Sequence, residues 1–306
     1  MGSAFPEPGP PLDASHVQVY RSRAMTAPPR SPAERDDVVV VTGAGGMGEA
    51  VARRLGPGRA VVLADASSEA LDRVSAALDA SGYRVHTLRV DVASASDVDT
   101  LAAAAAGLGR LRAVVHTAGV SPVQATPERI VAIDVVGTAR VLDAFAPYVE
   151  RGTVAVCIAS MAGTMTALDP HVLELLATTP TDRLSALDVL DPAKLDPGSA
   201  YGIAKRANQV RVEAASVAWG RRGGRVLSVS PGVIATPMGR AELAGPFGDV
   251  MRDMVARSGT GRVGTAEDVA AVVEFLVGPA ASFLTGTDLL VDGGVVAALR
   301  YGRERS

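Results

Sequence analysis

The sequence predicts an α/β protein built on a doubly wound parallel sheet. From residue 37 onward, short apolar runs alternate with amphipathic segments, which is typical of strands covered by helices on both faces of a sheet. A glycine-rich loop also joins the first apolar run to the first amphipathic segment. At 306 residues, the chain is long enough to bury a large core.

Each element follows from this alternation, taken in chain order. Runs rich in β-branched residues predict strands, whereas apolar residues spaced three and four apart predict helices. The predicted strands are residues 38–42, 60–65, 84–91, 111–119, 152–160, 225–230 and 288–294. The predicted helices are residues 46–55, 67–82, 96–109, 128–149, 197–220, 240–257 and 266–277.

Two segments lie outside the alternation. Residues 1–36 are rich in proline and poor in large apolar side chains, so this composition cannot repay the entropy of ordering and predicts a disordered tail. Residues 161–199 predict an inserted lid with short helical patterns at 170–179 and 181–190. The domain itself is predicted to span residues 37–306 and to include this insert.

The composition argues against several classes of function. The chain has 30 Lys and Arg against 33 Asp and Glu without a basic block, which does not fit a nucleic-acid-binding protein. No apolar run approaches the roughly 18 to 20 residues of a membrane helix, so we expect a soluble, cytoplasmic protein without a membrane partner. The single cysteine, Cys157, lies in an apolar run and predicts a buried, inert thiol.

The glycine loop predicts a dinucleotide site. Gly43, Gly45 and Gly48 have the G-x-G-x-x-G spacing between a strand and a helix. Glycines in this position permit a tight turn and let the backbone approach a diphosphate, while the helix N-terminus offers N–H groups. Gly46 and Met47, inside the loop, are expected to contact the cofactor as well.

Two aspartates indicate which dinucleotide is bound. Asp65 ends the second strand about 20 residues after the loop, where a carboxylate accepts hydrogen bonds from the ribose hydroxyls and repels a 2′-phosphate. Because the loop contains no Arg or Lys, NAD is favoured over NADP. A role for Asp65 in capping the helix at Ser67 is compatible with this function. Asp91 and Val92, after the third strand, are expected to meet the adenine.

Tyr201 and Lys205 lie four residues apart on one face of the predicted helix 197–220. Taken alone, they fit a core tyrosine beside a surface lysine. As a chemical pair, their phenol and ammonium groups can reach the same small volume. Lys205 would lower the pKa of Tyr201 by roughly 1 to 3 units, because a nearby cation favours the tyrosinate.

The order and spacing of these features resemble the short-chain dehydrogenase/reductase family in its short, single-domain form, over about residues 37 to 299. The features are the glycine loop, Asp65, Asp91, residues 116–119 (HTAG), Ser160, Tyr201 with Lys205, residues 231–232 (PG), Thr236 and residues 284–294. The insert is similar to that of the branch holding bacterial 3α-hydroxysteroid dehydrogenase/carbonyl reductase. The resemblance implies a Rossmann fold.

The resemblance also implies an activity and the residues responsible for it. The chain would be an NAD-dependent oxidoreductase acting on a hydrophobic secondary alcohol or its ketone, steroid-like in shape. Ser160 would donate a hydrogen bond to the substrate oxygen, and Lys205 would also hold the nicotinamide ribose. Further cofactor contacts are implied for Ala118, Gly119, Tyr201, Pro231, Gly232, Val233 and Thr236. The alternative is a protein of the same fold that senses NAD(H) without turnover.

The chain departs from the family pattern at three places. The loop at residues 42–48 is one residue shorter than usual. His116 replaces an asparagine, and we expect it to substitute in packing and hydrogen bonding. Asp134 stands where an asparagine usually anchors a water chain toward the lysine, and it joins Ser160, Tyr201 and Lys205 as a candidate catalytic residue. An ionised Asp134 would oppose tyrosinate formation yet strengthen the lysine's charge.

The resemblance implies a homo-oligomer with a small-molecule substrate and no metal. Family members commonly form tetramers through the helix before the serine strand and the helix that carries the tyrosine. Because the insert 161–199 adjoins the second of these helices, we expect it to obstruct that surface and to favour a dimer over a tetramer.

Overall fold

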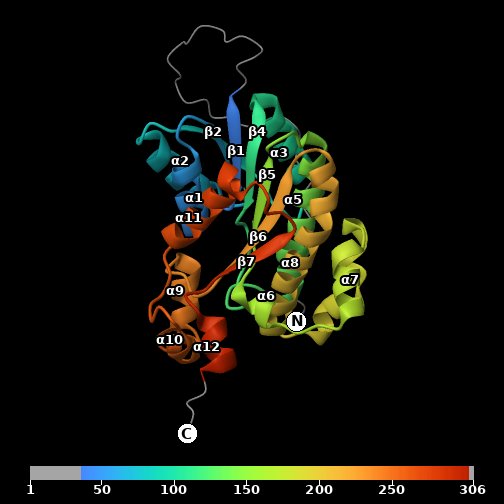
Figure 1. Cartoon of the computed structure of the whole chain (residues 1–306), viewed down its shortest axis with the longest axis vertical. Helices are drawn as coiled ribbons and strands as arrows, with labels where there is room; N and C mark the ends of the chain where they lie inside the picture. Colours follow the sequence, from blue (N-terminus) through green and yellow to red (C-terminus); the bar gives the residue numbers. More distant parts are fainter. Residues whose placement is uncertain (1–35, 303–306) are drawn as a thin grey trace, which may run out of the picture.

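The computed structural model describes residues 36–302, which form a seven-stranded sheet in the order β3-β2-β1-β4-β5-β6-β7 (Figure 1). The strands are β1 Asp37–Thr42, β2 Ala60–Asp65, β3 Arg84–Arg89, β4 Arg110–His116, β5 Val154–Ile158, β6 Arg225–Pro231 and β7 Thr287–Val291. All neighbouring strands are parallel. The predicted tail, except for Asp36, and residues 303–306 lie outside the described residues.

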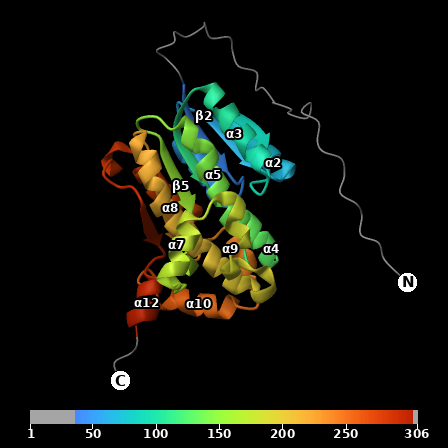
Figure 2. The ribbon, with the colours of Figure 1, turned by 90° about the vertical axis from the view of Figure 1, so that its right-hand side faces the viewer.

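Helices cover both faces of the sheet, as the predicted doubly wound class requires (Figures 1 and 2). One layer contains α1 Gly46–Leu55, α2 Ser68–Asp79 and α11 Ala266–Val277, and the other contains α3 Ala95–Leu108, α5 Thr138–Phe145 and α8 Pro197–Arg221. In β1, Val39 and Val41 pack against the first layer, whereas Val38 and Val40 pack against the second. Continuous apolar strands of this kind suit a sheet that is buried on both faces.

The chain reverses its direction of winding between β1 and β4, which are neighbours in the sheet but far apart in sequence. In such sheets, a crevice forms beyond the carboxyl ends of the strands at this switch point. The glycine loop follows β1, and residues 117–120 follow β4. The topology therefore brings two predicted parts of the site to the same edge of the sheet.

The predicted helix at 128–149 changes its helical geometry along its length. The chain forms α4 Pro127–Ile130, a π-helical turn at Val131–Gly137, α5 and a 3-10 turn at Ala146–Tyr148. The π-helical turn contains Asp134, whose Oδ1 accepts a hydrogen bond from the backbone N–H of Val120 at 2.9 Å. Single π-helical turns commonly occur at functional sites. The predicted helix is thus confirmed as one continuous helical segment, and only its π-helical turn was not predicted.

The insert at 161–199 is packed onto the domain. It contains α6 Met161–Met165, α7 Pro170–Thr178 and three 3-10 turns at Thr181–Ala186, Asp188–Leu190 and Pro192–Lys194. The first predicted helix at 170–179 is confirmed, whereas the pattern at 181–190 forms two 3-10 turns. Leu176, Leu184 and Leu190 are fully buried against α8 and the π-helical turn. Each such burial contributes about 1.5–3 kcal/mol.

A small group of helices closes the end of the domain near the carboxyl edge of the sheet (Figure 1). It contains α9 Pro237–Ala244, α10 Gly248–Arg257 and α12 Val295–Tyr301. The helices α9 and α10 replace the single helix predicted at 240–257. The helix α12 was not predicted. Met161, Val233, Val255 and Val295 form a separate apolar core between these helices and the start of α6.

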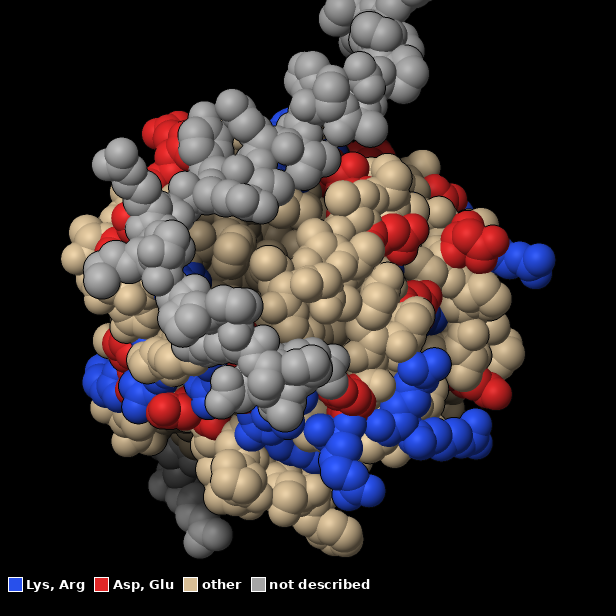
Figure 3. All heavy atoms as spheres, turned by 90° about the horizontal axis from the view of Figure 1, so that it is seen from above, with Lys and Arg blue, Asp and Glu red and all other residues tan. Residues whose placement is uncertain are grey.

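The surface has mixed charge where Figure 3 shows it. Acidic and basic side chains both occur on this face, which is viewed from the end of the sheet at which β1 begins. Ion pairs at the end of the sheet where β1 and β4 begin include that of Arg110 with Asp37 at 2.7 Å.

Within residues 36–302, no helix is both long and apolar enough to cross a membrane. Cys157 is buried in β5, and burial raises its pKa to about 12, which confirms the inert thiol.

Candidate active site

A pocket of about 380 Å³ opens at the carboxyl edge of the sheet, between the glycine loop, the segments after β2, β3 and β4, and the start of α9. Most of the predicted cofactor residues line it. These are Gly43, Gly45, Gly46, Met47, Gly48, Asp65, Asp91, Val92, Ala118, Gly119 and Thr236. Gly232 and Val233 instead line a smaller pocket of about 180 Å³. Pro231 ends β6 and lines neither pocket.

The three glycines of the loop have different structural roles. Gly43 has φ +92°, a left-handed conformation that favours glycine. A Cβ atom on Gly48 would lie 1.8 Å from the carbonyl oxygen of Gly43, so only glycine permits this approach of helix to strand. A Cβ on Gly45 would meet no atom within 4 Å. Gly45 thus borders open space at the start of α1, and this cradle fits a dinucleotide diphosphate.

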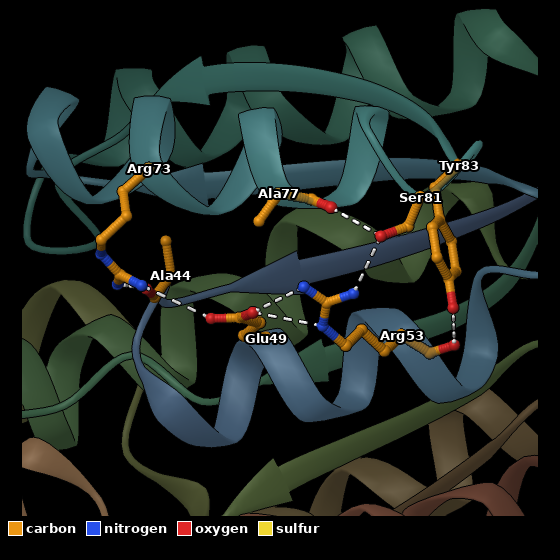
Figure 4. Close-up of polar contacts among 7 residues, drawn as sticks. All are labelled: Ala44, Glu49, Arg53, Arg73, Ala77, Ser81 and Tyr83. Atoms are coloured by element: carbon orange, nitrogen blue, oxygen red, sulfur yellow. Dashed lines mark hydrogen bonds and ion pairs between the residues drawn. The ribbon is translucent and has the colours of Figure 1, made fainter.

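Arg73, on α2, contacts the glycine loop and the start of α1 (Figure 4). Its guanidinium donates a hydrogen bond to the carbonyl of Ala44 at 3.2 Å and forms an ion pair with Glu49 at 3.4 Å. Glu49 also pairs with Arg53 at 2.9 Å, within α1. These contacts hold the loop carbonyl on the side of α2. The sequence offered no signal for Arg73, because α2 meets the loop only in the folded chain.

Both predicted ribose and adenine carboxylates also make local hydrogen bonds. Asp65 accepts from the N–H of Ala44 at 2.6 Å and from that of Ser67 at 2.8 Å. Ser67, and not Asp65, is the N-cap residue of α2, so Asp65 only accepts a hydrogen bond from the backbone just before the helix. Asp91 accepts from the N–H of Ala93 at 2.9 Å. Each aspartate is therefore held at a fixed position along the pocket.

The folded chain brings Ser160, Tyr201 and Lys205 together although Ser160 is far from the other two in sequence. Ser160 caps α6, and its hydroxyl accepts from the N–H of Ala162 at 3.1 Å. A Cβ on Gly163 would lie 2.6 Å from the carbonyl carbon of Lys205, so α6 packs directly on the backbone of α8. The ammonium of Lys205 lies 5.3 Å from the ring centroid of Tyr201.

The pKa of Tyr201 is raised in the structure, whereas the sequence predicted that Lys205 would lower it. Burial raises the pKa of Tyr201, and the charge of Lys205 and a hydrogen bond with Ser160 offset it only in part. The negative charges of Asp134 and Glu242 add to the increase. The sequence predicted a lowered pKa because it considered Lys205 without burial or these carboxylates. In this structure, Tyr201 remains a protonated phenol near neutral pH.

Asp134 forms a buried ion pair with Lys205. Its side chain is fully buried, and its Oδ2 lies 3.5 Å from the Lys205 ammonium. This distance is longer than that of a normal charge-assisted hydrogen bond, and Oδ2 has no hydrogen-bond donor among residues 36–302. Burial raises the pKa of Asp134. Burial is the largest single effect on the pKa of Lys205 and lowers it, but the interactions with Asp134 and Tyr201 together outweigh burial, and the net shift is upward.

His116 connects the glycine loop strand to the π-helical turn. Its Nδ1 lies 2.7 Å from the hydroxyl of Thr42, and its Nε2 lies 3.1 Å from the hydroxyl of Thr138. Thr138 in turn donates to the carbonyl of Asp134 at 2.7 Å. Burial lowers the pKa of His116 to about 3, with a contribution from Lys205. The neutral ring satisfies both hydroxyls, which agrees with the predicted packing role.

Glu242 is a further residue that sequence reasoning missed. It is half-buried on α9, and burial raises its pKa while the charge of Lys205 opposes this increase. Its charge also acts on Tyr201. Glu242 follows Thr236 by only six residues, yet nothing in that spacing indicates that α9 turns this carboxylate toward Tyr201.

Comparisons with known proteins agree with the geometry. The family model described as short chain dehydrogenase matches residues 37–169, and the one described as enoyl-(acyl carrier protein) reductase matches residues 193–296. The short-chain dehydrogenase/reductase bsc3 of Alternaria brassicicola is 42% identical over 263 residues, which cover 85% of this chain and 96% of that protein. The 3-alpha-hydroxysteroid dehydrogenase/carbonyl reductase of Comamonas testosteroni is 32% identical over 206 residues, covering 66% and 78%.

Solved structures have the same fold. The 3-alpha-hydroxysteroid dehydrogenase from Pseudomonas sp. B-0831, complexed with NADH, aligns with a TM-score of 0.70 and 27% sequence identity. The alignment covers 87% of this chain and 99% of that structure.

Proposed function

Because this chain belongs to the short-chain dehydrogenase/reductase family of oxidoreductases, which act on alcohols and ketones, we propose that it transfers a hydride between NAD(H) and a hydrophobic secondary alcohol or its ketone. The observation that supports this most directly is the meeting of Ser160, Tyr201 and Lys205 beside Gly119, which lines the same pocket as the glycine loop and Asp65. A Cβ on Gly119 would lie 3.2 Å from the ammonium nitrogen of Lys205. A nicotinamide cofactor bound there supplies or accepts the hydride.

The choice of NAD over NADP rests on Asp65. Its carboxylate lines the pocket after β2, where it would accept hydrogen bonds from the ribose hydroxyls and repel a 2′-phosphate. Arg89, which lies nearby in sequence, donates to the carbonyl of Ala66 at 3.1 Å. Arg73 is held by Ala44 and Glu49. Neither of these two arginines lines the pocket, so neither would offset the repulsion between Asp65 and a 2′-phosphate.

The protein's part in the chemistry is to place and move a proton. In ketone reduction, Tyr201 donates its phenolic proton to the substrate oxygen as negative charge develops there, and Ser160 donates a second hydrogen bond. The raised pKa of Tyr201 keeps this proton in place near neutral pH. Lys205 stays protonated because Asp134 raises its pKa, and its positive charge stabilises the tyrosinate that forms.

An apolar substrate is favoured by Met165, an exposed apolar side chain on the short helix that Ser160 caps. Relatives named for hydroxysteroids share this fold and part of this sequence, which favours a bulky, rigid ring system over a short linear alcohol.

Turnover with a panel of cyclic ketones tests the proposal. The purified protein should oxidise NADH in the presence of at least one ketone, and kcat/KM should be higher with NADH than with NADPH. Tyr201→Phe should lower kcat by about 100-fold or more, since it removes the proton donor. NADH binding, measured by calorimetry, should persist in this variant. The exposed Tyr148 supplies the control, and Tyr148→Phe should behave as the wild type.

Two results would contradict the proposal in different ways. A Tyr201→Phe variant within threefold of wild-type turnover would refute the assigned proton donor. Higher kcat/KM with NADPH would refute the cofactor preference and leave the reaction class intact.

A further inference from the structure

The charges that line the cofactor pocket are unbalanced. Asp65 and Asp91 contribute two carboxylates, and the single basic side chain in the lining, among the described residues, is Arg129. Arg129 lies on α4, and Ile133, four residues later, lines the same pocket. A dinucleotide adds the two negative charges of its diphosphate, so a cation at this pocket would stabilise the complex.

Arg129 has no protein partner in the part of the chain that the structure describes. Its side chain is exposed, and it makes no hydrogen bond or ion pair with any of residues 36–302. The adjacent Glu128 interacts with Thr126 instead, and that hydrogen bond lowers the pKa of Glu128. Arg73 and Arg89, the other arginines near the pocket, are occupied by Glu49 and by backbone carbonyls.

The glycine loop itself supplies only neutral groups to a diphosphate. It has no Lys or Arg, and no side chain caps the start of α1, where Gly45 is the N-cap residue. The N–H groups and the dipole of α1 therefore face the pocket without a formal positive charge. An arginine whose guanidinium can donate two parallel hydrogen bonds to phosphate oxygens would supply that charge.

We propose that Arg129 is a cofactor-binding residue that pairs with the diphosphate of NAD(H). This assignment rests on the proposed function. Arg129 holds the diphosphate from the α4 side of the pocket while the start of α1 holds it from the glycine-loop side. Its role is binding and orientation, and it takes no part in hydride or proton transfer.

Calorimetric titration with NADH and with two fragments tests the assignment. Arg129→Gln should weaken binding of NADH and of ADP-ribose by about fivefold to tenfold, and it should leave binding of adenosine unchanged, since adenosine lacks phosphate. The affinity for NADH should also become less sensitive to salt. Arg129→Lys should recover part of the loss. The matched control is Arg221→Gln, which removes an exposed arginine at the far end of α8.

The outcomes separate this assignment from the proposed function. If Arg129→Gln binds NADH as tightly as the wild type, Arg129 does not pair with the diphosphate. If Arg129→Gln weakens the binding of adenosine as much as that of NADH, Arg129 contacts the adenosine part of the cofactor. If the variant weakens only the binding of NADPH, Arg129 contacts a 2′-phosphate. Either result overturns the assignment. A wild-type protein that binds no dinucleotide would refute the proposed function and this assignment together.

Discussion

Asp134 acts on the pKa of both Lys205 and Tyr201. A fully buried carboxylate 3.5 Å from Lys205 keeps the lysine charged and raises the pKa of Tyr201. The structure excludes the reading of Asp134 as a solvated carboxylate on a helix face, because its side chain has no exposure. The same carboxylate anchors the backbone of Val120. Its charge and its hydrogen bond can therefore be separated by mutation.

Asp134→Asn should retain most activity because an amide oxygen still accepts from Val120. Since the negative charge of Asp134 raises the pKa of Tyr201, its removal should move the basic limb of the ketone-reduction profile to lower pH. Asp134→Ala also removes the anchor and should cost about 100-fold in kcat/KM. Profiles of kcat/KM against pH for the two variants measure this. Unchanged profiles in both would show that Asp134 has no influence on the proton donor.

His116 should make the protein sensitive to acid. Its pKa is lowered from 6.5 to about 3 in the folded chain, so the unfolded chain binds a proton that the folded chain does not as the pH falls through this range. Stability is then complete above pH 6.5 and falls by up to about 1.4 kcal/mol per pH unit below it. His116→Asn should flatten this dependence between pH 6.5 and 5, as followed by urea unfolding.

The control for His116 is His171→Asn, on the exposed surface of α7. It should leave the slope between pH 6.5 and 5 as in the wild type. If His116→Asn and the wild type have equal slopes, the acid sensitivity arises from other groups.

At the scale of elements, the insert is a packed layer that joins Ser160 to Tyr201. The sequence predicted a lid because this segment lies between two predicted catalytic residues. Its buried leucines, however, anchor it to α8 and the π-helical turn. Movement of the whole insert would expose these side chains to water, so any opening must involve its more exposed parts.

Leu184→Ala tests how firmly the insert is attached. It should lower the free energy of unfolding by about 2–5 kcal/mol, because a fully buried leucine leaves a cavity. KM for the ketone should rise, since the insert shapes the region around Tyr201. Chemical denaturation and steady-state kinetics give the two readouts.

Leu108→Ala, at an exposed position in α3, provides the comparison for Leu184→Ala and should change stability by less than about 1 kcal/mol. Equal stability of Leu184→Ala and the wild type would mean that the insert moves independently of the domain.

At the scale of the whole molecule, the insert occupies an apolar face that would otherwise be available for association. Leu176, Leu184 and Leu190 cover residues of α8 and the π-helical turn within the same chain. Because this face is already buried, we expect the protein to form a dimer in solution. Multi-angle light scattering should give twice the chain mass of 31.2 kDa. A tetramer in which α5 and α8 become protected from hydrogen exchange would contradict this expectation.

Much of the fold could be predicted because local rules act along the chain. The glycine spacing, the apolar strands and the helix that carries Tyr201 depend on residues close in sequence. The parallel sheet and the cover of both its faces are confirmed. The π-helical turn at Asp134 and the 3-10 turns of the insert were not predicted, because the packing of both on α8 connects residues that no local pattern relates.

By itself, the sequence determined the class of fold and predicted a dinucleotide loop and a proton donor, since each of these inferences depends on residue type and spacing. Only the tertiary structure decided the electrostatic state of the site. Burial and the carboxylates of Asp134 and Glu242 reverse the expected pKa shift of Tyr201. Desolvation and charge interactions depend on distances between elements far apart in the chain, and these distances exist only once the sheet, α9 and the insert have packed together.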